Sequence, residues 1–516
     1  MLRLMNLLAQ LLALHLQNEI NASLFLHSKI ECAVSAVRRS LLFSLADSYL
    51  GVMLQLASTL VISRLLSPTD IGIFSVAAVL AALASTFRDF GVAEYLIQEK
   101  ELTTSKIRAA FAANLIVSWL MAFILFGASG WVADFYRQPG VAEVMRVQSL
   151  NFLLIPFGAV TVAFFRRELN YRPIFIAGLL ANITSFLVAI AAALHGYGYM
   201  SLAWSSLAGV VVSVLVSVLM RPKDFPRLPS FSGLAEVARF GRHASGIYLF
   251  GQMGRSAPEA VIGRALDMPS VAYFSRANGL LEIFNRTVMR AVLPVCLPYF
   301  AQEARTGSGG GKGYLKATCL LTGVGWPFFL FIGAVSYSAI RLLYGPQWMQ
   351  SVPLTQILTI AAIFELPYFL TSEVMIAAGR IDQSNRLQFV VQSARLVSLL
   401  LVFPFGLTGA CWGLVAAALL GAFVSHQYLS RIIGLSFKEV LRAIAPSCWV
   451  SLYTMIPIWV LYAFFEQTES NYMVFLITSS GTALVAWLIA LRLCGHPFWQ
   501  ELVVIASKLK KQVSSA

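Results

Sequence analysis

Charged residues are scarce in this chain. Asp, Glu, Lys and Arg make up 12% of its 516 residues, whereas they make up about 25% of a typical soluble domain. Apolar residues reach 58%, against roughly 45 to 50% in soluble proteins. Apolar stretches long enough to cross a bilayer as a helix recur from end to end, with short polar breaks between them. The sequence therefore predicts an integral membrane protein without a soluble domain.

Several kinds of site are also missing. The six cysteines and six histidines are scattered without ligand spacing, which argues against a metal site and a disulfide framework. The segment TGSGGGKGY (Thr306–Tyr314) lacks the spacing and the final Ser or Thr of a phosphate-binding loop, so we expect a flexible cytoplasmic linker there. The net charge of +14 requires no nucleic acid, because basic cytoplasmic loops face anionic lipid headgroups. We expect no catalytic residue and no cofactor.

Fourteen membrane-spanning helices are predicted from the apolar windows. They cover residues 40–63, 70–90, 109–131, 144–165, 174–194, 200–220, 244–264, 271–298, 315–340, 353–378, 387–403, 408–430, 445–465 and 472–492. When residues within two positions of a span end are counted with the adjoining segment, 28 of the 38 Lys and Arg residues fall in one set of connecting segments, 5 in the opposite set and 5 inside spans. Because positive charge is retained on the cytoplasmic side, this bias supports the topology and places both termini in the cytoplasm.

Two features depart from an array of straight spans. Met1–Leu16 is rich in leucine but too short to cross a bilayer, and no small-residue cleavage site follows it. We expect residues 1–39 to form an interfacial amphipathic segment, or to result from a start codon assigned too far upstream. Prolines within or near span interiors predict kinks; they are Pro156, Pro294, Pro298, Pro327, Pro367 and Pro457.

The first six spans repeat as the next six in the same orientation. Arg64–Ala77 aligns with Arg264–Ala277 at an offset of 200, with identical residues at five positions. Gly196–Trp204 aligns with Pro404–Trp412 at nearly the same offset. Six crossings return the chain to its starting side, so the copies are parallel repeats. Such repeats predict a pseudo-two-fold axis along the membrane normal and a central cavity between two bundles.

An all-α polytopic fold with six segments follows from these patterns. They are an N-terminal extension (1–39), an N-terminal six-helix bundle (40–220), a basic cytoplasmic linker (221–243), a C-terminal six-helix bundle (244–430), helices 13 and 14 (431–492) and a basic cytoplasmic tail (493–516).

Three segments carry a family resemblance: SRLLSPTDIGIFSVAAVLAALASTFRDFGVAEYLIQ (Ser63–Gln98), GYGYMSLAW (Gly196–Trp204) and VIGRALDMPSVAYFSRANGL (Val261–Leu280). They resemble the polysaccharide transporter family of the multidrug, oligosaccharidyl-lipid and polysaccharide exporter superfamily, over roughly residues 38–492. The resemblance implies alternating-access export of a polyprenyl-diphosphate-linked oligosaccharide across the bacterial inner membrane, for exopolysaccharide, O-antigen or capsule synthesis. It implies membrane lipids, glycosyltransferases and a glycan polymerase as partners. The family often has Asp before its IGR segment, where this chain has Glu259.

A cationic stripe is predicted on the helix at 271–298. Arg276, Arg286 and Arg290 fall within about 80° of one another on an α-helix, while the first copy of this stretch, Val76–Thr86, is uncharged. A charge at mid-bilayer costs on the order of 2.5 to 3.5 kcal/mol, so such residues normally face an aqueous cavity or a partner. Guanidinium groups pair with phosphate oxygens in bidentate fashion. We therefore predict that these arginines, with Arg255, bind the diphosphate.

Structural ion pairing is the alternative explanation for each arginine. The candidate partners are the acids of the spans, Glu259, Glu282, Glu365 and Glu373. Glu282 precedes Arg286 by four residues, and Arg276 is near enough to the outer surface to snorkel. Asp47, Glu259, Glu365 and Glu373 are also candidates to exchange protons or bind sodium during transport, with pairing to Arg255 or Arg395 as the alternative.

Two other functions compete with glycan export. A multidrug and cation antiporter of the same superfamily carries cationic cargo, which an arginine-lined cavity repels. A polytopic glycan polymerase or ligase needs an extracytoplasmic catalytic site, yet the longest outer segment, Trp131–Glu143, has only Asp134 and Glu143 as carboxylates. We therefore expect a transporter rather than an enzyme.

Overall fold

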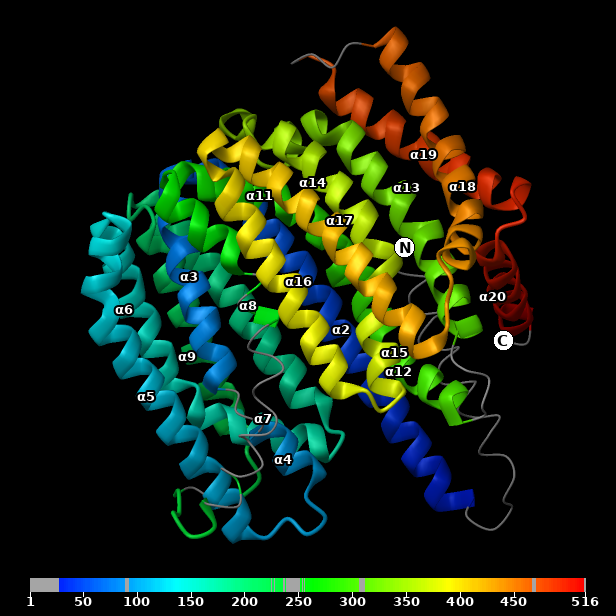
Figure 1. Cartoon of the computed structure of the whole chain (residues 1–516). Helices are drawn as coiled ribbons and strands as arrows, with labels where there is room; N and C mark the ends of the chain where they lie inside the picture. The colour runs from blue at the N-terminus through cyan, green and yellow to red at the C-terminus, as the bar shows by residue number, and fades with distance from the viewer. Residues whose placement is uncertain are drawn as a thin grey trace. The chain divides into compact units, whose positions relative to one another are not determined.

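A computed structural model describes residues 27–88, 92–223, 225–226, 228–234, 237, 251–252, 254, 256–305, 311–465 and 470–514. Within these ranges every regular element is a helix (Figure 1). Most of the predicted N-terminal extension and the first part of the predicted seventh span lie outside the described residues. The chain divides into two compact units: unit 1 comprises residues 1–66, 76–249 and 505–516, and unit 2 comprises residues 67–75 and 250–504.

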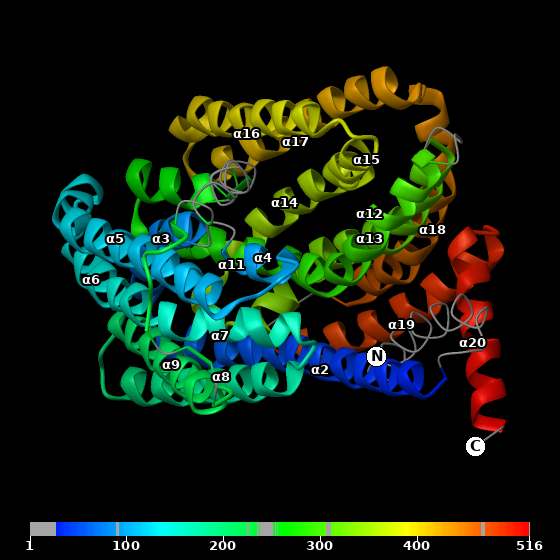
Figure 2. The same cartoon turned by 90° about the horizontal axis from the view of Figure 1, so that it is seen from below.

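Unit 1 is built from the helices of the N-terminal half. They are α2 (His27–Leu65), α3 (Pro68–Arg88, whose first residues belong to unit 2), α4 (Val92–Gln98), α5 (Thr104–Tyr136), α6 (Pro139–Leu154), α7 (Pro156–Arg167), α8 (Tyr171–Leu194) and α9 (Met200–Leu219). Helix α8 packs against both α2 and α9, and α5 packs along α6, as Figure 2 shows. The short α4, absent from the span predictions, packs on α7.

Unit 2 begins with a helix at residues 256–265. The elements that follow are α11 (Met268–Phe284), the π-helical turn η1 (Asn285–Met289), α12 (Arg290–Arg305), α13 (Gly311–Leu343), η2 (Pro346–Trp348), α14 (Ser351–Glu365), η3 (Leu366–Tyr368), α15 (Thr371–Ala377), α16 (Ile381–Val402), η4 (Phe403–Phe405), α17 (Gly406–Ile433), α18 (Phe437–Phe464), α19 (Tyr472–Leu493) and α20 (Pro497–Ser514), whose last residues belong to unit 1. Helix α13 packs against α14, α18 and α19, and α17 packs against α14 and α16.

The described parts of all fourteen predicted spans are helical except for short breaks, such as those at Ile155 and at residues 369–370, and a few residues at span ends. Nine helices in the described ranges are long and apolar enough to cross a membrane, or ten if the bent pair α6 and α7 forms one span. The four predicted spans outside this set are 40–63, 244–264, 271–298 and 387–403. The π-turn η1 accounts for the third of these, because it divides the span into α11 of 17 residues and α12 of 16 residues. The polar start of α16 accounts for the fourth. The multi-span all-helical fold is thus confirmed, while the number fourteen and the two-fold symmetry stay predictions.

The turns before α3 and α11, which the sequence repeat aligns with each other, cap these helices with the same two residue types. At α3, the Ser67 Oγ accepts from the Asp70 N–H (3.2 Å) and an Asp70 carboxylate oxygen accepts from the Ser67 N–H (3.2 Å). At α11, 200 residues later, the Asp267 carboxylate accepts from the Ser270 N–H (2.8 Å). The serine and the aspartate have exchanged places between the copies. Both residue types stabilise a helix start, so the same turn forms in either order.

Three irregularities interrupt the long helices. Helices α6 and α7 meet at Pro156 with a bend of 51°, as predicted from this proline. Pro367 lies in the 3-10 turn η3 between α14 and α15. In η1 the N–H of Arg290 bonds to the carbonyl of Asn285, five residues back. A π-turn holds more residues per turn than an α-helix. The rotation of about 100° per residue, from which the arginine stripe is predicted, is therefore wrong across residues 285–289.

Candidate functional site

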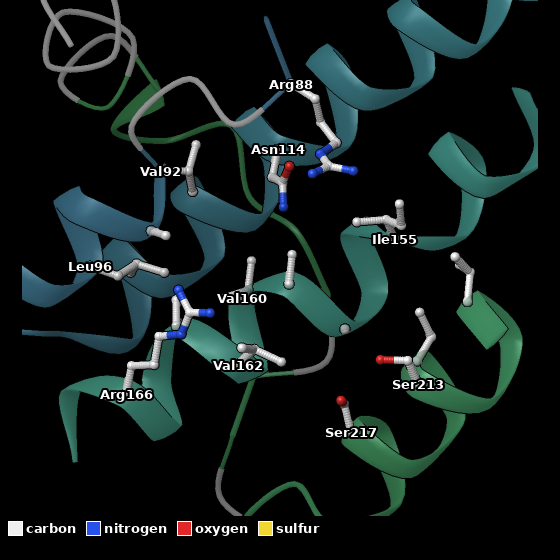
Figure 3. Close-up of a pocket in the computed structure, with 16 residues that line it drawn as sticks. Arg88, Val92, Leu96, Asn114, Ile155, Val160, Val162, Arg166, Ser213 and Ser217 are labelled. Carbon is white, nitrogen blue, oxygen red and sulfur yellow. The ribbon is translucent and has the colours of Figure 1, made fainter. Parts of the chain in front are cut away.

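A pocket of about 410 Å³ lies within unit 1, formed by residues from the end of α3 and from α4, α5, α7 and α9 (Figure 3). Its polar groups are Arg88, Asn114, Arg166, Ser213 and Ser217, set among apolar walls. The described lining residues include two arginines and no carboxylate. This volume falls within the range of small-molecule sites, and the lining gives the pocket a positive potential.

Helix ends position the two arginines. Arg88 is the last residue of α3, and its guanidinium lies 5.7 Å from the ring centroid of Phe152. Arg166 lies in the last turn of α7, beyond the bend at Pro156. Figure 3 shows the two side chains on different sides of the pocket, with Asn114 beside Arg88 and the two α9 serines on a third side. The arginines thus belong to separate helices whose ends the fold brings to one pocket.

The arginine next to Arg166 has a different role. Arg167 donates hydrogen bonds to the carbonyl oxygens of Leu96 (2.7 Å) and Glu99 (2.6 Å) at the end of α4. These bonds satisfy carbonyls that a helix C-terminus leaves without partners. In the same loop, the Glu99 carboxylate accepts a hydrogen bond from Lys106 Nζ (2.9 Å), which lowers the pKa of Glu99. Arg167 therefore fixes the short helix that forms one wall of the pocket.

Asp47 lies on α2 and interacts electrostatically with Arg166. Gly178 on α8 leaves room for its carboxylate, because a Cβ at this glycine would lie 2.6 Å from an Asp47 oxygen. The candidate acid of the first predicted span is therefore associated with the pocket arginine of α7. The sequence indicated neither this pairing nor the packing on Gly178.

Arg276 is enclosed within unit 2 by its own neighbours. Its guanidinium carbon lies 5.5 Å from the ring centroid of Tyr344 and 5.2 Å from that of Trp348. Glu259 interacts with Arg276 electrostatically and accepts a hydrogen bond from Ser275. The charge of Arg276 is thus met inside the fold, by a carboxylate and two aromatic faces.

Of the remaining residues of the predicted stripe, Arg286 interacts electrostatically with Tyr344, the same ring that Arg276 contacts. Arg286 lies inside the π-turn η1, and Arg290 follows it as an exposed residue at the start of α12. Glu282 accepts a hydrogen bond from the Asn285 side chain (3.2 Å). Arg255 lies outside the described residues. The structure therefore places Arg286 and Arg290 around a distorted turn rather than along one regular helix face.

The other predicted acids and Arg395 are divided between two places in unit 2. Arg395 on α16 pairs with Glu365 at the end of α14, with 3.9 Å between Nη2 and Oε1. Glu373 lies on α15, where one carboxylate oxygen is buried without a hydrogen-bond partner. Within the described ranges, no group of three or more His, Cys, Asp or Glu residues is arranged to hold a metal ion.

The pocket residues were not among the predicted site residues. We had counted Arg88 and Arg166 with the cytoplasmic loops, because they lie at the edges of predicted spans. A weak signal existed in the polar residues of otherwise apolar helices, namely Asn114 in α5 and the pair Ser213 and Ser217, spaced four apart on α9. Such residues usually face the protein interior or a cavity in a membrane protein.

The fold has known counterparts among membrane transport proteins. The chain matches a structure of the lipid II flippase MurJ in an inward closed conformation, with a TM-score of 0.68 at 13% identity, over 90% of this chain and 99% of that one. It matches an inward-facing multidrug resistance MATE family transporter with a TM-score of 0.58 at 16% identity, over 75% and 96% of the two chains. At these identities the similarity establishes the fold, which is that of polytopic transporters.

The family follows from the sequence match. A family model described as "Polysaccharide biosynthesis protein" matches residues 61–353, more than half of the chain, and the chain belongs to this family. Among its relatives, the succinoglycan biosynthesis transport protein ExoT of Rhizobium meliloti is 25% identical, over 58% of this chain and 61% of that protein. The lipopolysaccharide biosynthesis protein WzxC of Escherichia coli is 21% identical, over 78% and 82%. The match therefore spans about three-fifths of ExoT and about four-fifths of WzxC.

Proposed function

We propose that the chain is a flippase that moves a polyprenyl-diphosphate-linked oligosaccharide across the bacterial inner membrane for exopolysaccharide, O-antigen or capsule synthesis. The pocket of unit 1 carries the proposal, because Arg88 and Arg166 supply two guanidinium groups and the described lining supplies no carboxylate. A diphosphate is an anion that guanidinium groups bind through paired hydrogen bonds. The names of ExoT and WzxC, which refer to transport or biosynthesis of polysaccharides, support this cargo.

The same lining disfavours a multidrug and cation antiporter. The MATE match shows that the fold also serves transporters of that class. A cationic drug at this pocket would meet two like charges in a partly dehydrated site, where repulsion is stronger than in water. The proposed chemistry involves no covalent change, so the protein acts as a transporter and not as a glycan polymerase or ligase.

The proposal also covers additional phosphate contacts, the ion that drives transport, the orientation in the membrane and the partner enzymes. Arg286 and Arg290 are proposed as additional phosphate contacts, because Arg290 is exposed and Arg286 lies in a π-turn, an element often found at functional sites. Asp47 is proposed to couple transport to a proton or a sodium ion through Arg166. We further propose that both termini are cytoplasmic and that glycosyltransferases and a glycan polymerase of the same pathway supply and consume the cargo.

Reconstitution in proteoliposomes tests the function directly. A fluorescently labelled polyprenyl-diphosphate oligosaccharide is placed in the inner leaflet, and its arrival outside is measured with a membrane-impermeant quencher. We expect faster translocation than in protein-free liposomes, while uptake of a cationic dye stays at background. Dye transport without glycolipid translocation would establish the antiporter instead, and polymerised product would establish the enzyme.

A further inference from the structure

Helix α16 carries a polar stripe through the part predicted to lie in the membrane. Gln388, Gln392 and Arg395 follow one another at intervals of four and three residues, so they share a face of the helix. Helix α16 packs along α17 (Figure 2). Its Gln388 bonds to Ser372 of α15, and its Gln392 lies against Gly254. A polar face is costly in a membrane helix unless its groups have partners.

These side chains form a connected hydrogen-bond chain within unit 2. The Gln392 amide donates to the Gln388 amide oxygen (3.4 Å), and the Gln388 amide donates to the hydroxyl of Ser372 on α15 (2.9 Å). Arg395 extends the line to Glu365 through the 3.9 Å ion pair. We call Gln388, Gln392, Arg395 and Ser372 the amide seam. Because its one cation is paired with a carboxylate, the seam carries little net charge.

Two atoms of the amide seam lack partners. The Gln392 side-chain oxygen and the Arg395 Nε are both buried without a hydrogen bond. One is an acceptor and the other a donor, three residues apart on the same helix face. The backbone of Gly254 lies against the Gln392 side-chain amide. A Cβ at Gly254 would lie 1.9 Å from the Gln392 oxygen, so only a glycine fits there without a shift. Burying such groups unpaired costs free energy, so a ligand able to satisfy both is favoured.

We propose that the amide seam binds hydroxyl groups of the transported sugar. A hydroxyl both donates and accepts, so one such group can donate to the Gln392 oxygen and accept from the Arg395 Nε–H. A phosphate cannot donate in this way when fully ionised, and a metal cation cannot satisfy the N–H. Both atoms are covered in this conformation, so a sugar binds them in a conformation in which they are exposed.

This inference rests on the proposed flippase function and concerns only the glycan part of the cargo. The amide seam of unit 2 binds the glycan, which differs from one cargo to another. Sites that hydrogen-bond a hydroxyl discriminate strongly against ligands that lack it, so the seam is a determinant of sugar specificity.

The test compares two ligands that differ only in the sugar. Affinities of the full chain in nanodiscs are measured for undecaprenyl diphosphate and for undecaprenyl-diphosphate-linked oligosaccharide. The variant carries Gln388→Leu and Gln392→Leu, and the control carries Gln356→Leu at an exposed position of α14. We expect the double variant to bind the glycolipid at least tenfold more weakly, with less than a twofold change for the bare diphosphate. The control keeps both affinities.

Each other outcome overturns the inference in a recognisable way. An equal loss for both ligands would make the seam a structural element, and unchanged affinities would remove it from the site. Loss of sodium or proton dependence without loss of discrimination would assign the seam to ion coupling. If the unmodified chain bound neither ligand, the proposed function itself would fail. A single Gln392→Leu variant, which removes the unpaired oxygen itself, serves as the readout if the double variant is not recovered folded.

Discussion

The two units treat their membrane-associated arginines in opposite ways. In unit 1, Arg88 and Arg166 line a pocket whose described lining has no carboxylate, and Asp47, which is not part of that lining, interacts electrostatically with Arg166. In unit 2, Arg276 is enclosed by Tyr344 and Trp348 beside Glu259. The chemistry of the guanidinium group is the same in each case. Its surroundings decide whether the charge is available to a ligand or is used to hold the fold together.

Hydropathy and the structure rank these arginines in opposite orders as candidates for ligand binding. Arg276 stands deep in a predicted span and looked functional, whereas Arg88 and Arg166 stand at span edges and looked like topology signals. A charge inside an apolar segment needs compensation, and the protein most simply supplies it from neighbouring side chains. Arg88 and Arg166 lie at helix ends and line the pocket of unit 1, which the hydropathy of the sequence does not indicate.

The largest expected effect follows from removing both pocket charges. In the double variant Arg88→Gln and Arg166→Gln, translocation of the glycolipid should fall at least 100-fold, since each charge-assisted bond contributes about 1.5 to 3 kcal/mol. Proteoliposome flux gives the measurement, and thermal melting in detergent should be nearly unchanged. Arg172→Gln, at an exposed position in the first turn of α8, is the matched control. Normal flux in the double variant would contradict the assignment of the pocket.

The enclosed arginine of unit 2 should show the opposite pattern. Arg276→Gln leaves Glu259 without its cation and the two rings without their charge, which costs on the order of 3 kcal/mol. We expect a lower melting temperature and less folded protein, with flux per folded molecule retained. Arg305→Gln, exposed at the end of α12, is the control. A fall in flux at unchanged melting temperature would return Arg276 to the substrate site.

Adjacent arginines on α7 provide the sharpest version of the comparison. Arg167→Gln removes the bonds to the Leu96 and Glu99 carbonyls and should lower the melting temperature, because hydrogen bonds from a charged donor contribute about 1.5 to 3 kcal/mol. Arg166→Gln should instead lower flux about tenfold with little change in melting. Identical behaviour of the two variants would remove the distinction between a pocket charge and a structural charge.

A smaller effect is expected from His496, which lies between α19 and α20. It is fully buried; its Nδ1 accepts from the Phe498 N–H (3.1 Å), and its Nε2 lies 3.0 Å from the Ser447 Oγ and 3.5 Å from the Cys319 Sγ. Burial lowers the pKa of His496 below 6.5. The unfolded chain then binds the proton more readily, so stability is complete above pH 6.5 and declines below it.

Thermal melting between pH 7.5 and pH 5 measures this effect. The melting temperature should fall with acidification in the unmodified chain, and His496→Asn should flatten that dependence at some cost in stability. The charged groups nearest in sequence to these contacts, Lys316 and Glu501, form an exposed pair (3.3 Å) between α13 and α20. Lys316→Gln should leave the pH dependence in place. Persistence of the full dependence in His496→Asn would assign it to another group.

Much of the fold was predictable because the membrane imposes simple rules. Apolar length and the positions of Pro156 and Pro367 correctly indicated helices, their approximate bounds and two of their interruptions, while the orientation drawn from the Lys and Arg bias stays a prediction. The π-turn η1 was not predictable, since Asn285–Met289 contains no residue that demands it. Neither was α4, whose seven residues are too short for a periodic signal and depend on the carbonyl bonds of Arg167.

The sequence alone determined that this chain is a multi-span helical membrane protein, because composition and apolar length follow from the solvent in which a helix must be stable. Its motifs, and not its composition, indicated the polysaccharide transporter family, to which the family match assigns the chain. Tertiary structure alone decided which arginines are available to a ligand. Arg166 and Arg167 are chemically identical neighbours, and only the packing of α4 and α7 gives one a pocket and the other a set of carbonyl partners. Binding depends on what surrounds a charge in space, and those surroundings come from residues far away in the chain.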